Sequence, residues 1–165
     1  MALFISIEGG EGSGKSTVGD YLAQRMRDNQ IDLVHTFEPG DTKLGAELRR
    51  LLFQTREAGG EPVSPWTETL LFLADRTHHV ETVIRPALAR GAVVLCDRYI
   101  DSTMAYQAYG RRLDLEKIRQ MNHDATDGLL PNLTLFLDVG VQDGLRRAHP
   151  EKQDRIGLET IDFHA

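Results

Sequence analysis

The chain has 165 residues, a net charge of −6, 41% hydrophobic residues and 27% charged residues. This length predicts one domain, residues 1–165, and the acidic balance argues against a broad nucleic-acid-binding surface. Its only cysteine, Cys96, can form no internal disulfide, which favours a reducing, cytoplasmic setting. No apolar run approaches the roughly 20 residues that span a membrane, and the N-terminus lacks the pattern of a signal peptide.

The first third of the chain alternates between predicted strands and predicted helices. Leu3 to Glu8 is an apolar, β-branched run that ends at glycines, as a buried parallel strand does. Apolar residues then recur at helical spacing from Lys15 to about Arg27. A second strand is predicted at Asp32 to Phe37, where a Pro-Gly pair stops it, and a helix follows from about Leu44 to Phe53.

The middle of the chain has one clear loop, Gln54 to Pro65, before its longest predicted helix. The Ser-Pro pair at the end of this loop can cap the helix, with proline at the first helical position. The helix extends from about Trp66 to Ala89, and Pro86 should kink or divide it. A third strand, Ala92 to Asp97, is as apolar as a central strand should be.

The last third contains two polar helical segments, at about Ser102 to Tyr109 and Leu115 to Thr126. A fourth strand at Leu133 to Val139 precedes a charged tail. Strands that alternate with helices predict an α/β fold built on a parallel sheet flanked by helices.

A phosphate-binding loop is predicted at Gly9 to Ser16, which reads GGEGSGKS and satisfies G-x-x-x-x-G-K-[ST]. Its glycines let backbone N–H groups surround phosphate oxygens, Lys15 would reach the β and γ phosphates, and the Ser16 hydroxyl would bind Mg²⁺. The motif follows a predicted strand and opens a predicted helix, unlike an accidental glycine-rich turn. Because no NKxD element follows and the chain is short, a small-molecule kinase is favoured over a GTPase or a large ATPase.

Charged and aromatic residues suggest a second substrate. Asp97 and Arg98 stand at the carboxyl end of a predicted strand, where Asp97 could hold Mg²⁺ through water and Arg98 could pair a phosphate. A plain ion pair is the alternative. Phe72 and Arg76 share one helix face and could stack and hydrogen-bond a base, although an aromatic at this spacing could equally belong to the core. The segment from Asp101 to Gly110 could line a sugar or form an ordinary polar helix.

In combination and order, these segments resemble the bacterial thymidylate kinase family: IEGGEGSGKST, FEPGDTKLGAELRRLL, LLFLADRTHHVETVIRPAL, GAVVLCDRYIDSTMAYQAYGR, PNLTLFLDV, GLRRA and DRI. The resemblance implies a P-loop NTPase-type fold of the nucleoside monophosphate kinase kind, transfer of the γ-phosphoryl group of ATP to dTMP, and a homodimer. Relatives continue through a further helix and a last edge strand, which this sequence lacks. The alternatives are another nucleotide or deoxynucleoside kinase, and a nucleotide-binding form with little activity.

The resemblance also implies roles at the ATP side and at the nucleotide phosphate. The ATP phosphates would be bound by Gly10, Glu11, Gly12, Ser13, Gly14, Lys15, Ser16 and Thr17. Mg²⁺ would be held by Ser16 and Asp97. Glu11 would also approach the 3′-hydroxyl of the acceptor sugar. Arg49 and Arg98 would clamp the dTMP phosphate, with Glu38 near the acceptor nucleotide.

For the acceptor base and sugar, the resemblance implies that Phe72 stacks on thymine and Arg76 bonds its O4. Tyr106 would crowd the 2′ position and so favour deoxyribose. Thr103 and Gln107 would border the base and the sugar.

A mobile lid is predicted at about residues 144–157. The phosphate loop has no arginine, so we expect Arg147 or Arg155 to act with Lys15 and Arg98 as catalytic residues when the lid closes. A solvated charged turn is the alternative. Two positions depart from the family pattern: Phe37 stands where relatives usually have arginine, and Gly157 where they usually have an acidic residue.

Overall fold

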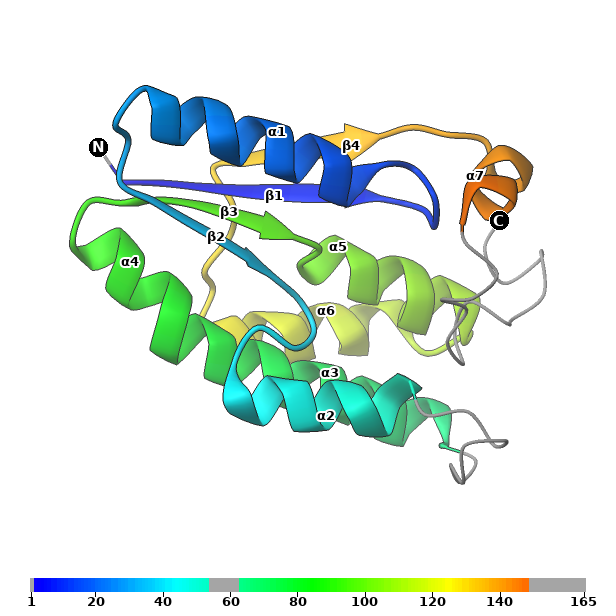
Figure 1. Cartoon of the computed structure of the whole chain (residues 1–165). Helices are drawn as coiled ribbons and strands as arrows, with labels where there is room; N and C mark the ends of the chain where they lie inside the picture. Colours follow the sequence, from blue (N-terminus) through cyan, green and yellow to red (C-terminus); the bar gives the residue numbers. More distant parts are fainter. Residues whose placement is uncertain (1, 54–62, 149–165) are drawn as a thin grey trace.

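A computed structural model describes residues 2–53 and 63–148 (Figure 1). Its described strands form one parallel sheet in the order β2-β3-β1-β4. These strands are β1 (Leu3–Gly9), β2 (Leu33–Phe37), β3 (Val93–Asp97) and β4 (Leu133–Leu137). Because all four strands are parallel, their carboxyl ends meet at one edge of the sheet, which is where ligands bind in such folds.

Helices cover both faces of the sheet, with α1 on one face and α4 on the other (Figure 1). The helices are α1 (Lys15–Asp28), α2 (Lys43–Phe53), α3 (Pro65–His79), α4 (Arg85–Ala89), α5 (Ile100–Thr103), α6 (Leu115–Thr126) and α7 (Val141–Arg147). Two π-helical segments, η1 (Val80–Ile84) and η2 (Met104–Gly110), continue α3 and α5. None of the helices in the described ranges is long and apolar enough to cross a membrane.

The core has two parts because β1 buries side chains on both of its faces. Phe4 packs with Val80 and Ile84 on the side of η1 and α4. Ile5 packs with Ala23 on the side of α1. This burial on both faces explains the continuous apolar runs in the sequence, and it confirms the expected parallel α/β architecture.

The long helix predicted from Trp66 to Ala89 is divided, as expected. The division is not a kink at Pro86 itself but the π-helical segment η1, which ends two residues before it. The N–H of Arg85 donates to the carbonyl of Val80, five residues back, in the wider π-helical pattern. Proline offers no N–H to continue the ladder and its ring crowds the preceding turn, so the wider turn accommodates it. At the start of α3, the predicted cap is confirmed, since the Ser64 hydroxyl accepts from the N–H of Thr67 at 3.1 Å.

Two other helical predictions need correction. The polar segment predicted from Ser102 begins at Ile100 and becomes π-helical from Met104. The start of the charged tail forms α7, which the charge pattern did not indicate. Most of the predicted loop, residues 54–62, lies outside the described residues, as does the lid from residue 149 on.

Candidate active site

The phosphate loop joins β1 to α1, as predicted. Gly12 and Gly14 have φ values of 64° and 93°, a left-handed conformation that glycine adopts without strain. The ammonium of Lys15 donates to the carbonyls of Gly9 at 2.9 Å and Gly10 at 2.8 Å, so it points into the curl of its own loop. Burial, and then the nearby Arg98 charge, lower the pKa of Lys15 to about 8. A polyphosphate in this loop would bring negative charge next to Lys15 and so favour its charged form.

Ser16 and Asp97 form a pair beside this loop that fits a hard cation. The Ser16 hydroxyl donates to Oδ2 of Asp97 at 3.1 Å. Oδ1 of Asp97 is buried and has no hydrogen-bond partner among the described residues. Buried carboxylate oxygens normally have a hydrogen-bond or metal partner. Mg²⁺ prefers oxygen ligands, so this hydroxyl and carboxylate could coordinate it together with substrate phosphates and water.

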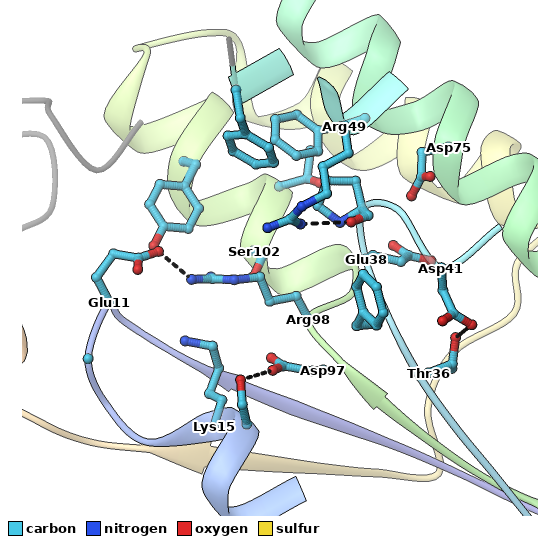
Figure 2. Close-up of a pocket in the computed structure, with 18 of the residues that line it drawn as sticks. Glu11, Lys15, Thr36, Glu38, Asp41, Arg49, Asp75, Asp97, Arg98 and Ser102 are labelled. Carbon is cyan, nitrogen blue, oxygen red and sulfur yellow. Dashed lines mark hydrogen bonds and ion pairs between the residues drawn. The ribbon is translucent and has the colours of Figure 1, made fainter. Parts of the chain in front are cut away.

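Arg98 lies at the junction of β3 and α5 and points toward the phosphate loop (Figure 2). Its backbone is left-handed, with a φ of 67°, which is uncommon outside glycine. The guanidinium lies 2.7 Å from Oε1 of Glu11, donates to Ser102 at 3.2 Å and sits 5.3 Å from the centre of the Tyr106 ring. The predicted alternative, a plain ion pair between Asp97 and Arg98, is therefore not what the structure shows, since Arg98 pairs with Glu11.

Glu8 holds this junction and was not singled out from the sequence. Its carboxylate accepts from the N–H of Tyr99 at 2.7 Å and from the Ser102 hydroxyl at 2.7 Å. Burial raises the pKa of Glu8 above its ordinary value. Because both bonds go to residues just after Arg98, Glu8 helps to maintain the turn that aims Arg98.

One pocket of about 1000 Å³ brings nearly all of the predicted site residues together. Figure 2 shows Lys15 and Asp97 at one end and Glu38 and Arg49 at the other, with Arg98 and Glu11 between them. Its lining includes the predicted residues Glu11, Gly12, Gly14, Lys15, Ser16, Thr17, Glu38, Arg49, Phe72, Arg76, Asp97, Arg98, Thr103, Tyr106, Gln107 and Arg147. Gly10 and Ser13 belong to the same loop but not to this lining, and Arg155 lies outside the described residues.

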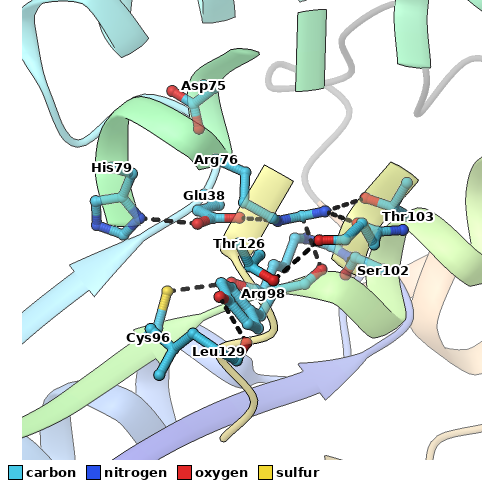
Figure 3. A network of polar contacts seen from close by, with 12 residues as sticks. Glu38, Asp75, Arg76, His79, Cys96, Arg98, Ser102, Thr103, Thr126 and Leu129 are labelled. Carbon is cyan, nitrogen blue, oxygen red and sulfur yellow. Dashed lines mark hydrogen bonds and ion pairs between the residues drawn. The ribbon is translucent and has the colours of Figure 1, made fainter. Parts of the chain in front are cut away.

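Arg76 is held in place at the far end of the pocket (Figure 3). Its side chain is only 2% exposed. Nε donates to Glu38 at 2.8 Å, Nη1 to Thr103 and Asn122, and Nη2 to the carbonyl of Tyr99 at 2.9 Å. A guanidinium has five N–H groups, and these bonds use four of them. Within the described residues, the second N–H of Nη2 is left to donate to a ligand.

Aromatic rings surround Arg49 at this end of the pocket. Its guanidinium lies 4.7 Å from the centre of the Phe53 ring and 6.0 Å from that of Phe37. Phe72 meets Phe53 edge-on, with 6.2 Å between ring centres, and belongs to neither core cluster of the described part. Phe37, the departure from the family pattern, therefore supplies an aromatic surface for Arg49.

Behind the pocket wall lies a buried polar network that the sequence did not reveal (Figure 3). His79 contacts Oε1 of Glu38 at 2.8 Å through Nδ1 and the hydroxyl of Thr36 at 2.6 Å through Nε2. Asp75 also faces this network, and burial together with the Glu38 charge raises the pKa of Asp75 to about 6. Atoms of Glu38, His79 and Cys96 lie within 4.8 Å of one another, but the hydrogen bonds of His79 already account for its two nitrogens.

The predicted lid, about residues 144–157, overlaps the end of α7, and α7 packs against the tip of the phosphate loop. A Cβ atom added to Gly12 would overlap the carbonyl of Gly144, and one added to Gly144 would overlap the carbonyl of Glu11. This backbone-to-backbone contact is possible only because both positions are glycine. It places Arg147, at the end of α7, on the pocket lining next to the loop.

Comparison with known proteins identifies the family. The thymidylate kinase family model matches residues 7–165. The chain belongs to the thymidylate kinase family. A thymidylate kinase of Synechococcus sp. (strain JA-2-3B'a(2-13)) is 53% identical over 162 residues, covering 98% of this chain and 75% of that protein. A thymidylate kinase of Desulfovibrio desulfuricans (strain ATCC 27774 / DSM 6949 / MB) is 48% identical over 170 residues, covering 98% of this chain and 77% of that protein.

A solved structure agrees with the fold of the thymidylate kinase family. The crystal structure of a thymidylate kinase from Ehrlichia chaffeensis superposes with a TM-score of 0.73 at 36% identity, covering 89% of this chain and 82% of that one. The predicted family and the predicted P-loop α/β fold are therefore confirmed. Among the four described strands of this chain, β4 is an edge strand of the sheet.

Proposed function

We propose that this chain transfers the γ-phosphoryl group of ATP to dTMP and so produces dTDP. Membership of the thymidylate kinase family supports this reaction. The observation that carries the proposal is that one continuous pocket joins the phosphate loop to an end lined by arginine and aromatic side chains. The phosphate-loop end suits a triphosphate, and the aromatic end suits a nucleoside monophosphate. Transfer requires the phosphate of the monophosphate to lie next to the γ-phosphate of the triphosphate.

The donor half of this mechanism rests on the loop that contains Lys15. Backbone N–H groups and the start of α1 would bind the ATP phosphates, and Lys15 would turn from the loop carbonyls to the β and γ oxygens. Ser16 and Asp97 would hold Mg²⁺, directly or through water, and the bound ion would compensate charge on the phosphates. The loop residues Gly10, Gly12, Ser13, Gly14 and Thr17 complete this donor site in the proposal.

The acceptor half would be aligned by charge and shape. Arg98 and Arg49 would clamp the dTMP phosphate, Phe72 would stack on thymine and Arg76 would donate to O4. Glu11 pairs with Arg98 in this structure and would move toward the sugar 3′-hydroxyl when the phosphate takes its place. Tyr106, beside Arg98, would crowd the 2′ position. No general base is needed because the acceptor phosphate is already an anion.

The Phe72 ring should contribute measurably to nucleotide binding. Phe72→Ala should weaken dTMP binding by about 1–3 kcal/mol, since stacking on a base is worth that much. Isothermal titration of dTMP would measure the change, and Phe136→Ala, which removes an exposed ring on β4, provides a matched control. Unchanged affinity in the Phe72 variant would remove this residue from the site.

Lid arginines should supply the guanidinium charge that the phosphate loop, which has Lys15 but no arginine, lacks. We expect Arg147→Ala, or Arg155→Ala, to lower turnover about 100- to 1,000-fold, as loss of one transition-state donor does. Arg146→Ala is the control, because Arg146 is exposed on the same helix, pairs with Asp143 and does not line the pocket. If the Arg147 and Arg155 variants both retain full turnover, this part of the mechanism is wrong.

The glycine contact between α7 and the phosphate loop gives a separate prediction. Gly144→Ala should push α7 off the loop and lower turnover about 10- to 100-fold, because small displacements of aligned groups are costly in phosphoryl transfer. Gly140→Ala is the matched control, since its added Cβ would meet only the Asp143 carboxylate, 3.7 Å away. Equal kcat for the two variants, measured by ADP release, would show that this contact does not position the lid.

A survey of acceptors tests the proposed reaction against its alternatives. ADP release coupled to a dye would be followed with ATP, Mg²⁺ and each of dTMP, dCMP, GMP and AMP. The proposal predicts that dTMP is used best. Preference for another monophosphate would indicate a different nucleotide kinase, and tight dTMP binding without turnover would indicate a nucleotide-binding form.

We further propose that residues 1–165 act as one kinase domain in the cytoplasm and pair as a homodimer. Exposed leucines on α2 and α3 support a helical dimer surface: Leu44, Leu51 and Leu70 are 49%, 46% and 55% exposed. Light scattering on a size-exclusion column would distinguish a dimer from a monomer.

A further inference from the structure

The side-chain amide of Gln107 is oriented by a hydrogen bond to Glu68, a residue that has no role in the phosphoryl transfer proposed above. The side chain lies on η2, is 1% exposed and lines the pocket. Its Nε2 donates to Oε1 of Glu68 at 2.8 Å. Glu68 is fully buried at the start of α3, 39 residues away in sequence.

Arg111 keeps the side chain of Glu68 as a carboxylate that accepts hydrogen bonds. Its Nε donates to one carboxylate oxygen at 3.0 Å and its Nη2 to the other at 3.0 Å, in the two-pronged geometry typical of strong arginine–carboxylate pairs. A carboxylate paired in this way can only accept hydrogen bonds. The amide of Gln107 can therefore face Glu68 only with its NH₂ group, which decides the orientation of nitrogen and oxygen.

With its NH₂ group on Glu68, the Gln107 amide turns its oxygen, the one acceptor that it has, away from that carboxylate and toward a ligand. Thr103, one helical turn earlier, accepts from Nη1 of Arg76, and both Arg76 and Gln107 line the pocket. The pocket therefore offers a guanidinium donor and an amide acceptor at this end. A donor beside an acceptor matches a base edge with a carbonyl next to a ring N–H, as in thymine. Cytosine presents an amino group and an unprotonated ring nitrogen, which is the opposite pattern.

We propose that Glu68, held by Arg111, is a specificity-determining positioning residue that makes the base end of the pocket read a ring N–H. The proposal rests on the proposed thymidylate kinase function. Glu68 does not touch the nucleotide; it prevents the Gln107 amide from rotating to present its NH₂ group. A site whose polar groups are left unpaired by the wrong base discriminates much more strongly than an apolar site does.

Glu68→Gln tests this inference, because a neutral amide can donate to the Gln107 oxygen and permit the rotation. The ratio of kcat/KM for dTMP to kcat/KM for dCMP should fall about tenfold or more, as loss of one polar discrimination does. Glu47→Gln is the control, since Glu47 is exposed on α2 and pairs with Arg50 outside the pocket. An unchanged ratio in a Glu68→Gln variant that melts at the temperature of the unaltered protein would overturn the proposal.

A second measurement uses the unaltered protein and does not depend on how Glu68→Gln folds. The side-chain NH₂ protons of Gln107, assigned by their loss in Gln107→Leu, should exchange with deuterium far more slowly than those of Gln120. Gln120 also donates to a carboxylate, that of Asp124, but on the exposed face of α6. Equal exchange rates would overturn the inference. Failure of the chain to phosphorylate dTMP at all would instead refute the proposed function, so the two failures are distinguishable.

Discussion

Lys15→Ala should lower kcat for phosphoryl transfer about 100- to 1,000-fold while the fold remains intact. Lys15 is buried in the loop, and within residues 2–53 and 63–148 its ammonium bonds only loop carbonyls and a serine hydroxyl. Removing it takes away a charge that stabilises the transferring group in a site shielded from water, where one such donor is worth two to three orders of magnitude. Initial rates of ADP release at saturating ATP and dTMP would measure the loss.

Lys43→Ala is the control for that experiment, because Lys43 is exposed at the start of α2. Its kcat and melting temperature should both match those of the unaltered protein. The Lys15 variant should also melt normally or at a higher temperature, since burial of this ammonium disfavours its charged form in the free protein. A kcat within twofold of the unaltered value would contradict the assigned role.

Arg98→Ala should lower kcat/KM for dTMP about 100- to 1,000-fold. The guanidinium is aimed by a left-handed backbone turn and is half surrounded by Glu11, Ser102 and the Tyr106 ring. Loss of one partner of a close charge pair costs about 2–5 kcal/mol, and Arg98 would be such a partner for the dTMP phosphate. Steady-state kinetics with dTMP as the varied substrate would measure the change.

Arg98→Lys should not restore this loss, because an ammonium cannot replace the planar, two-pronged donor geometry of a guanidinium. Arg119→Ala serves as the matched control, since Arg119 is exposed on α6 and pairs only locally with Glu116. Full recovery of kcat/KM in the lysine variant would mean that Arg98 acts as a simple point charge and not as a clamp.

Local patterns predicted the position and the conformation of the phosphate loop. The phosphate loop was recognisable because its conformation depends on consecutive residues, with Gly12 and Gly14 at left-handed positions. Asp97 and Arg98 were placed correctly at the ligand-binding edge because parallel strands bring their carboxyl ends together. Family resemblance then placed Phe72 and Arg76, whose spacing alone could not distinguish a base platform from a core helix.

The supporting residues could not be predicted, because their partners are distant in sequence. Glu68 meets Arg111 across 43 residues, and His79 meets Glu38 across 41. No sequence periodicity indicates such pairs. Because carboxylates are rarely buried, a glutamate on a helix is expected to be exposed to solvent until the fold is known. The close contact of Gly12 with Gly144 was invisible for the same reason, since it joins two segments that have no pattern in common.

Transfer of label from ATP tests the central claim most directly. The protein would be incubated with Mg²⁺, dTMP and ATP labelled in the γ-phosphoryl group, and the products separated by chromatography. We predict that the label appears in dTDP, in amounts equal to the ADP formed, and that omission of dTMP leaves it in ATP. Label released as inorganic phosphate, or retained in ATP while dTMP is bound, would contradict the proposed phosphoryl transfer.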